Sequence, residues 1–239
     1  MSEQQFYESV AGEINLWELD RRQNRYFQDM IRYDNILKLI PPKPLKILDL
    51  GCGDGYLSYL LAGEGHQVTA LDLSPTRLEK FKTVAQQYGI EQIIGDVKQT
   101  GLPSQNFDLI VSSEVLEHIT GYQEVILEAR RLLKTNGLLI VTVPHDEPTK
   151  ILTCPHCLKK FYRDGHVNRF NRINLPAALT EEALQVVKVT VARSKILNQL
   201  QYHLKLKYGA ALKLTDRLLC ALFPRQTLYL IVVARKSNS

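Results

Sequence analysis

The 239-residue sequence lacks the features of several classes of protein. It has no run of eighteen apolar residues, so no segment is apolar enough to cross a membrane as a helix. Its four cysteines, Cys52, Cys154, Cys157 and Cys220, form no disulfide-like pattern, which suits a reducing compartment. A net charge of +5 is too small to indicate a nucleic-acid partner by itself.

The composition instead predicts one large globular domain, or such a domain with an appendage. Hydrophobic residues make up 45% and charged residues 23% of the chain, so a core can form without disulfides or metal. The first five residues are polar and acidic, unlike a secretory signal, and we expect a cytoplasmic protein.

Short apolar runs alternate with helical patterns along most of the chain. Apolar strands of this kind, separated by helices, indicate a parallel sheet that is covered on both faces. We predict an α/β fold, namely a Rossmann-like, doubly wound, mostly parallel seven-stranded sheet with helices on both faces. The predicted strands are 47–50, 67–72, 92–94, 107–112, 138–143, 186–191 and 227–234. The predicted helices are 56–62, 75–88, 121–133 and 177–184.

Three segments lie outside this alternation. Residues 1–43 carry apolar residues at helical spacing and end in prolines, which predicts an N-terminal helical extension before a domain of residues 44–239. Residues 153–172 contain cysteines, histidines and basic residues and are expected to form a loop or small knuckle. Residues 197–225 carry leucines near helical spacing, with lysines among them, and predict a helical insertion before the last strand.

The most specific motif follows the first predicted strand and places Asp49, Gly51, Gly53 and Gly55 at alternate positions. Glycine adopts positive φ and allows a ligand to approach the backbone closely. Such a loop between a strand and a helix predicts the binding of a nucleotide-like cofactor. A dinucleotide-binding loop would have glycine or alanine where this chain has Tyr56.

Asp72 ends the second predicted strand. A carboxylate at that point can accept hydrogen bonds from both hydroxyls of a ribose. The alternative is a structural aspartate that acts like a helix cap before Ser74.

The glycine pattern resembles the motif of class I S-adenosylmethionine-dependent methyltransferases. The string from Phe107 to Ile119, with Ser113, Glu114 and His118, resembles the fourth strand and following helix of one subgroup. That subgroup includes ubiquinone-biosynthesis O-methyltransferases and many small-molecule methyltransferases. The resemblance covers roughly residues 44–145 and implies an enzyme that uses S-adenosyl-L-methionine.

The resemblance also implies roles for individual residues. Gly53 and Gly55 would contact the methionine part of the cofactor and Asp49 its amino group, while Asp96 would bind the adenine amino group between Leu73 and Val97. An ordinary turn aspartate is the alternative for Asp96. The full expected cofactor set is Asp49, Gly51, Cys52, Gly53, Gly55, Asp72, Leu73, Asp96, Val97, Ser113 and Glu114.

Two histidines follow strands at the edge where such a site is expected. His118 comes after the fourth strand and His145 after the fifth, and either could remove a proton from a hydroxyl, phenol or amine acceptor. The alternative for each is a packing or surface histidine. Glu114 and Glu117 are expected to be structural or to line the cofactor rather than to act as acid–base groups.

Cys154 and Cys157, with His166 nine residues later, fit part of a tetrahedral zinc site. Some methyltransferases of the subgroup carry a similar Cys-Pro-x-Cys insert after the fifth strand, with a further histidine where this chain has Tyr162. A structural zinc ion and a metal-free loop therefore both remain open, and redox chemistry is a third alternative.

These motifs predict transfer of a methyl group to a small-molecule acceptor, most readily to oxygen. One alternative is an RNA or protein methyltransferase that uses the basic residues Lys159, Lys160, Arg163, Arg169 and Arg172. Another is a non-catalytic interaction protein that binds S-adenosylmethionine.

The remaining expectations concern the partners of the chain. A nucleic-acid partner is not expected, and the chain is either a monomer or a homodimer. The insertion at 197–225 is a solvated face, a lid, a dimer contact or a site of peripheral membrane or lipid contact. The resemblance also implies that the N-terminal segment, with Trp17, Tyr26 and Tyr33, closes over the cofactor.

Overall fold

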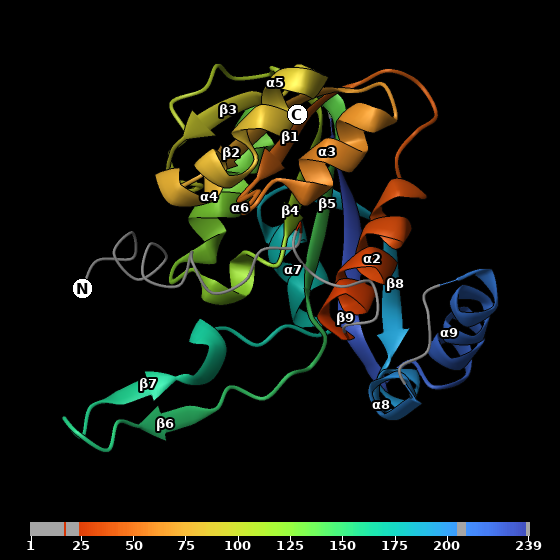
Figure 1. Cartoon of the computed structure of the whole chain (residues 1–239). Coiled ribbons are helices and arrows are strands. Elements are labelled where there is room, and N and C mark those ends of the chain that lie inside the picture. The colour runs from red at the N-terminus through yellow and green to blue at the C-terminus, as the bar shows by residue number, and fades with distance from the viewer. Residues whose placement is uncertain (1–16, 18–23, 205–208, 238–239) are drawn as a thin grey trace.

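A seven-stranded sheet with the order β3-β2-β1-β4-β5-β9-β8 forms the centre of the protein (Figure 1). The computed structural model describes Trp17, residues 24–204 and residues 209–237. The strands are β1 (Lys46–Leu50), β2 (Gln67–Asp72), β3 (Glu91–Ile94), β4 (Phe107–Ser113), β5 (Leu133–Pro144), β8 (Leu184–Ser194) and β9 (Thr227–Lys236). Strand β9 is antiparallel to both of its neighbours, and the other pairs are parallel. The predicted mostly parallel seven-stranded sheet is confirmed.

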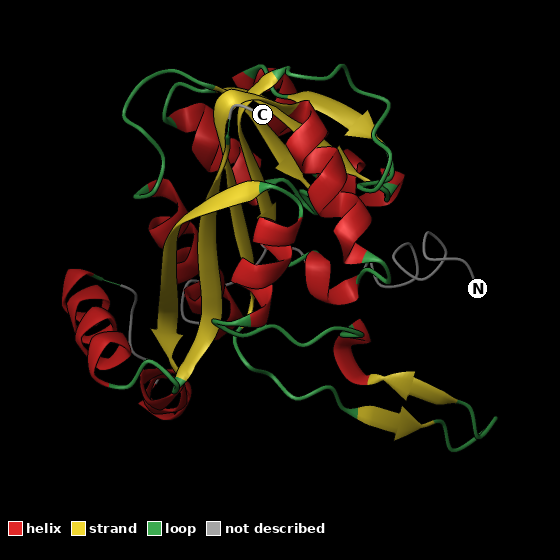
Figure 2. Cartoon of the chain, turned by 180° about the vertical axis from the view of Figure 1, so that it is seen from behind, coloured by secondary structure: helices red, strands yellow, loops and turns green. Residues whose placement is uncertain are grey.

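Helices cover both faces of the sheet, which confirms the doubly wound architecture (Figure 2). One face carries α2 (Asn24–Leu37), α3 (Tyr56–Gly63), α4 (Pro75–Lys80) and α5 (Lys82–Tyr88). The other carries α6 (Tyr122–Leu132) and α7 (Asn174–Glu181). Successive strand residues serve opposite faces, as Ile47 packs in the first layer and Leu48 in the second.

The helix predicted over residues 75–88 is two helices. Ser74 caps the first, because its hydroxyl accepts the backbone N–H of Arg77 at 3.2 Å, and Pro75 occupies the first helical position. Phe81 then leaves helical geometry, with φ −116° and ψ 16°, and buries its ring under the glycine loop. Helix α7 begins three residues earlier than predicted because Leu175 joins the core.

The two inserts differ in structure. Residues 153–172, expected as a loop or knuckle, contribute to an antiparallel hairpin of β6 (Ile151–Thr153) and β7 (Lys160–Tyr162) that projects from the body (Figure 1). The helical insertion is confirmed as α8 (Lys195–Leu204) and α9 (Ala210–Leu222).

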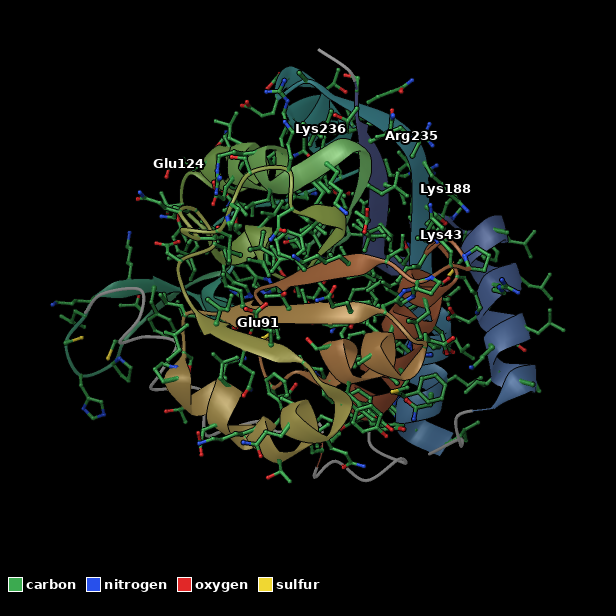
Figure 3. All side chains as sticks on the ribbon, turned by 90° about the horizontal axis from the view of Figure 1, so that it is seen from above. Lys43, Glu91, Glu124, Lys188, Arg235 and Lys236 are labelled. Carbon is green, nitrogen blue, oxygen red and sulfur yellow. The ribbon has the colours of Figure 1, made fainter. Side chains whose placement is uncertain are left out.

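Helix α2 packs against β8 and α8, so the described part of the N-terminal extension belongs to the same body. Seen from above, charged side chains such as Lys43, Lys188 and Lys236 surround the β8–β9 side of the sheet (Figure 3). None of the described helices is long and apolar enough to cross a bilayer.

Candidate functional site

A cavity of about 1010 Å³ lies at the carboxyl ends of the parallel strands. The loops after β1, β2 and β3 form one half of its lining. The ends of β4 and β5, the short 3-10 helix η2 (Leu116–His118), helix α2 and the base of the β6–β7 hairpin form the other half. A ligand that fills the first half therefore faces the second directly.

The glycine loop is held by backbone hydrogen bonds. The N–H groups of Gly51 and Cys52 both donate to the carbonyl oxygen of Leu71, at 2.8 and 2.9 Å. Gly51 has φ +81° and no room for a side chain, since a Cβ atom would lie 2.5 Å from Val115. Gly53 has φ +57° and faces the cavity, and a Cβ atom there would meet only the end of the Arg77 side chain, at 3.4 Å, so a ligand could approach the backbone.

Four of the predicted cofactor residues line the same half of the cavity, namely Asp72, Leu73, Asp96 and Val97. The carboxylate of Asp72 accepts the backbone N–H groups of Gly53 at 2.8 Å and of Ser74 at 2.9 Å. The carboxylate therefore holds the local backbone, as the structural interpretation predicts, and it also faces the cavity, while its contact with a ribose stays a prediction. Asp96 is exposed and accepts the backbone N–H of Lys98 at 2.8 Å.

Two predicted cofactor residues do not line the cavity. Asp49 is 1% exposed and accepts the hydroxyl hydrogen of Ser58 at 2.7 Å, and burial raises its pKa to about 7. Gly55 lies over the ring of Phe81, with only 2.3 Å between the ring and the place of a Cβ atom. Both residues therefore support the loop from below, and the expected contacts with the methionine part of a cofactor stay predictions.

Glu114 joins the two halves of the cavity. Its backbone has φ +58°, and its carboxylate accepts the Thr142 hydroxyl at 3.1 Å. The guanidinium of Arg32 lies 3.8 Å from the second carboxylate oxygen. Burial raises the pKa of Glu114, an effect that Arg32 opposes. The neighbouring Ser113 also lines the cavity.

The second half of the cavity contains a cluster of Glu117, His118 and His166. The rings of His118 and His166 meet edge to face with centroids 4.8 Å apart, and His118 Nε2 lies 3.8 Å from Glu117 Oε1. Glu117 is 1% exposed, and neither carboxylate oxygen has a hydrogen-bond partner among the residues that the structure describes. Burial raises its pKa well above the usual range, so the carboxyl group holds a proton more firmly than an exposed glutamate.

His118 is set up to be neutral. Its Nδ1 lies 3.3 Å from the carbonyl oxygen of Gly165, and donation of a hydrogen there leaves Nε2 unprotonated. Burial, assisted by His166, lowers the pKa of His118 to about 4. The imidazole can therefore accept a proton at neutral pH.

His145 also lines the cavity, at the end of β5. It is 4% exposed, its Nδ1 lies 2.7 Å from the Thr227 hydroxyl, and burial lowers its pKa. Both histidines predicted from their place after a strand thus reach one cavity.

The structure does not bring the three predicted zinc ligands together. Cys154 and Cys157 lie at the turn of the β6–β7 hairpin, whereas His166 lies beyond its base, next to Glu147 at 3.2 Å. Among the described residues, one group of three places its ligand atoms within 4.8 Å of one another, and it consists of Glu117, His118 and His166. In this structure the hairpin therefore separates the two cysteines at its turn from His166 beyond its base, and the zinc site stays a prediction.

The sequence predicted that the N-terminal segment covers the site but not the charged residues of α2 that line it. Arg32 is 5% exposed, forms an ion pair with Asp29 at 2.9 Å and lies over the ring of Tyr229. Of the three expected aromatic residues, Tyr33 lines the cavity, whereas Trp17 and Tyr26 do not. The available signal was a pair of charged residues, Asp29 and Arg32, within a helix whose apolar residues pack in the core.

Comparison with known proteins agrees with this geometry. Residues 48–141 match the family model described as a methyltransferase domain. The matched residues thus run from within β1 to most of β5 and include the glycine loop and both strand-end aspartates.

Two curated relatives extend the likeness. The chain is 39% identical over 101 residues to a ubiquinone biosynthesis O-methyltransferase of Histophilus somni, covering 39% of this chain and 42% of that protein. It is 32% identical over 144 residues to the mitochondrial ubiquinone biosynthesis O-methyltransferase of Schizosaccharomyces pombe, covering 52% of each. The chain therefore spans about half the length of the curated relatives it matches.

Solved structures show the same fold beyond residues 48–141. An S-adenosylmethionine-dependent methyltransferase from Mesorhizobium loti has a TM-score of 0.62 at 19% identity, covering 86% of this chain and 97% of that one. A Burkholderia thailandensis N1-methyltransferase with bound S-adenosylhomocysteine has a TM-score of 0.61 at 17% identity, covering 98% and 87%. The [4+2]-cyclase SpnF has a TM-score of 0.66 at 19% identity, covering 98% and 96%. These likenesses establish the fold, which such different enzymes share.

Proposed function

We propose that the chain is an S-adenosylmethionine-dependent methyltransferase that methylates an oxygen of a small-molecule acceptor. The observation that carries this proposal is that Asp72 and the glycine loop line the same cavity as His118 and Glu117. The match of residues 48–141 to a methyltransferase domain supports the reaction class. The names of the two curated relatives support oxygen as the acceptor atom.

The residues present fit the cofactor. Asp72 would accept the ribose hydroxyls, Gly53 offers open backbone, and Asp96 with Leu73 and Val97 would hold the adenine. S-adenosylmethionine supplies a methyl group on a sulfonium, which an oxygen nucleophile can displace. The protein then has to align the acceptor and receive its proton.

We assign the proton to Nε2 of His118. A neutral imidazole is available because the pKa of His118 is lowered to about 4. Glu117 lies beside the same atom, with its Oε1 3.8 Å from Nε2, and lines the cavity there. His145 is the second candidate, and it would face the acceptor from the end of β5.

The alternative of an RNA or protein acceptor receives less support from the basic insert. Arg163 pairs with Glu147 and Asp164, and Arg169 pairs with Asp146, so both charges are neutralised locally. Phe170 is 2% exposed and cannot stack on a base.

A two-stage experiment tests the proposed function. Calorimetry with S-adenosylhomocysteine tests the cofactor site, and failure to bind would overturn the proposal. A panel of catechols and phenols, with S-adenosylhomocysteine formation as the readout, then tests the acceptor class. Transfer to RNA or protein, but to no small molecule, would contradict the assignment of the acceptor.

A further inference from the structure

The helices α8 and α9 each present a row of apolar side chains to solvent. Three residues of α8, Ile196, Leu200 and Leu204, are four positions apart and share one side of the helix. Leu214, Leu218 and Leu222 form the same pattern on α9. The exposed fractions of these six side chains run from 46% for Ile196 to 69% for Leu222.

The opposite sides of the two helices are buried against the rest of the protein. On α9, the buried carboxylate of Asp216 accepts the backbone N–H groups of Arg193 at 3.1 Å and Ser194 at 2.8 Å. On α8, Leu197 and Gln201 are each 1% exposed. These contacts fix how both helices are rotated, so the outer leucines cannot turn inward. Exposed apolar rows of this extent mark an interaction surface.

The charge of the segment selects the kind of partner. Residues 195–225 contain six lysine or arginine residues and one acidic residue, Asp216. Asp216 is 3% exposed and Lys213 forms an ion pair with Asp34, so the exposed charged residues described in this segment are Arg217 and Arg225, both positive. A second copy of the chain would bring two positive surfaces together, which is unfavourable. Leucine rows flanked by basic residues suit the headgroup region of an anionic bilayer.

The position of the surface agrees with this partner. Strand β8 runs parallel to β5, because β9 is antiparallel to both. Helix α8 therefore starts at the edge of the sheet that holds the cavity, and Lys195 lines the cavity itself. Figures 1 and 2 place α8 and α9 on the opposite side of the molecule from the β6–β7 hairpin.

We propose that the outer faces of α8 and α9 dock the protein on an anionic membrane surface, with the cavity beside the contact. The leucine rows enter the headgroup boundary, and the basic residues Arg217 and Arg225 lie against anionic headgroups. The helices lie on the bilayer and do not cross it. This inference does not depend on the proposed methyl transfer.

Vesicle sedimentation with the full chain tests the inference. We expect binding to vesicles of phosphatidylglycerol and phosphatidylcholine in equal parts, and little binding to phosphatidylcholine alone. The triple variant Leu214→Ser, Leu218→Ser, Leu222→Ser should bind the anionic vesicles about tenfold more weakly or worse. Arg217→Gln and Arg225→Gln should each weaken binding about fivefold, and high salt should act in the same direction.

Leu127→Ser is the matched control, because Leu127 is an exposed leucine (46%) on α6, away from the proposed surface. It should bind vesicles like the unchanged chain. Thermal unfolding and S-adenosylhomocysteine affinity should not change in the triple variant, which separates docking from folding and from cofactor binding. The inference is overturned if the unchanged chain stays in the supernatant, or if the triple variant binds equally well. It is also overturned if the chain is a dimer that the triple variant converts to a monomer.

Discussion

The carboxylate of Asp72 accepts the backbone N–H of Gly53 at 2.8 Å, so the end of β2 holds the tip of the glycine loop. The second oxygen accepts the N–H of Ser74 at 2.9 Å, which fixes the start of α4. The same side chain lines the cavity. Loop shape and cofactor binding are therefore linked through one carboxylate.

Replacement of this carboxylate by an amide should weaken cofactor binding. Asp72→Asn keeps the size of the side chain but turns one acceptor into a donor that faces a backbone N–H. We expect the affinity for S-adenosylhomocysteine to fall about tenfold or more, the scale of one charge-assisted hydrogen bond. Calorimetry measures the loss, and Glu79→Gln, on the exposed surface of α4, is the control. An unchanged affinity for Asp72→Asn would contradict the ribose assignment.

Two glycines of the loop should respond differently to alanine. Gly55→Ala would place a methyl group 2.3 Å from the Phe81 ring at φ +73°, so we expect a loss of about 2 kcal/mol or more in the free energy of unfolding. Gly53→Ala meets only the end of Arg77 at 3.4 Å, and its left-handed φ should cost about 1 kcal/mol. Urea unfolding measures both values.

The same pair separates support of the loop from contact with the ligand. Gly53→Ala should weaken S-adenosylhomocysteine binding more than its small loss of stability explains, because the added methyl group occupies the open space. Equal losses of stability in the two variants would contradict the packing role of Gly55.

The rate of methyl transfer should not show the titration of an ordinary histidine. Burial and His166 lower the pKa of His118 to about 4, so the imidazole is neutral and able to accept a proton throughout the range above pH 5. The protein is first treated with a chelator, because Glu117, His118 and His166 could hold a metal ion. We then expect kcat to stay level from pH 8 to about 5 and to fall as His118 becomes protonated nearer pH 4. A fall centred near pH 6.5 would contradict the assignment.

The free energy of unfolding should also depend on pH through the protonation of His118. Between the folded pKa of about 4 and the usual value of 6.5, the unfolded chain binds more protons at this position than the folded chain. The contribution of His118 to stability is therefore full above pH 6.5 and decreases as the pH falls. His118→Gln should reduce this pH dependence and lower kcat about 100-fold or more, while S-adenosylhomocysteine affinity stays unchanged.

The four cysteines should react with iodoacetamide in a fixed order. Hydrogen bonds from the backbone N–H groups of Cys157 and His156 lower the pKa of Cys154, so this thiol should react first. Burial raises the pKa of Cys220 to about 12 and that of Cys52 well above its usual value. Mass spectrometry of timed samples gives the order, and early modification of Cys220 would contradict it. Cys52 lines the cavity, so bound S-adenosylhomocysteine should slow its reaction further.

The sheet was predictable because its strands are continuous apolar runs, and such runs fit only a sheet covered on both faces. The half of the cavity that the loops after β1, β2 and β3 line was predictable for a related reason. Its residues follow strand ends at short distances along the chain, so the parallel topology alone gathers Gly53, Asp72 and Asp96 at one edge.

In the other half, His118 and His145 follow strand ends and were predicted, but the wall formed by α2 was not, because it joins residues far apart in the sequence. Arg32 and Tyr229 lie 5.1 Å apart in a cation–π contact, and no local pattern connects α2 with β9. The hairpin was not predicted because its apolar residues Ile151, Leu152 and Phe161 are exposed, so its strands do not show the alternation of a half-buried strand. His166 was grouped with the cysteines by its spacing, whereas the hairpin carries the cysteines away from it.

The helical insertion leaves the sheet and returns to it at the same place. The backbone N–H of Lys195 donates to the carbonyl oxygen of Gln226 at 2.9 Å, and Ser194 pairs directly with Thr227. Strands β8 and β9 are therefore the two arms of one hairpin, and the whole segment of α8 and α9 is its loop. A tight turn could join the arms without changing the register of any strand. Evolution can accordingly lengthen, shorten or exchange this loop, and so change where the protein resides, while the cofactor half of the cavity stays the same.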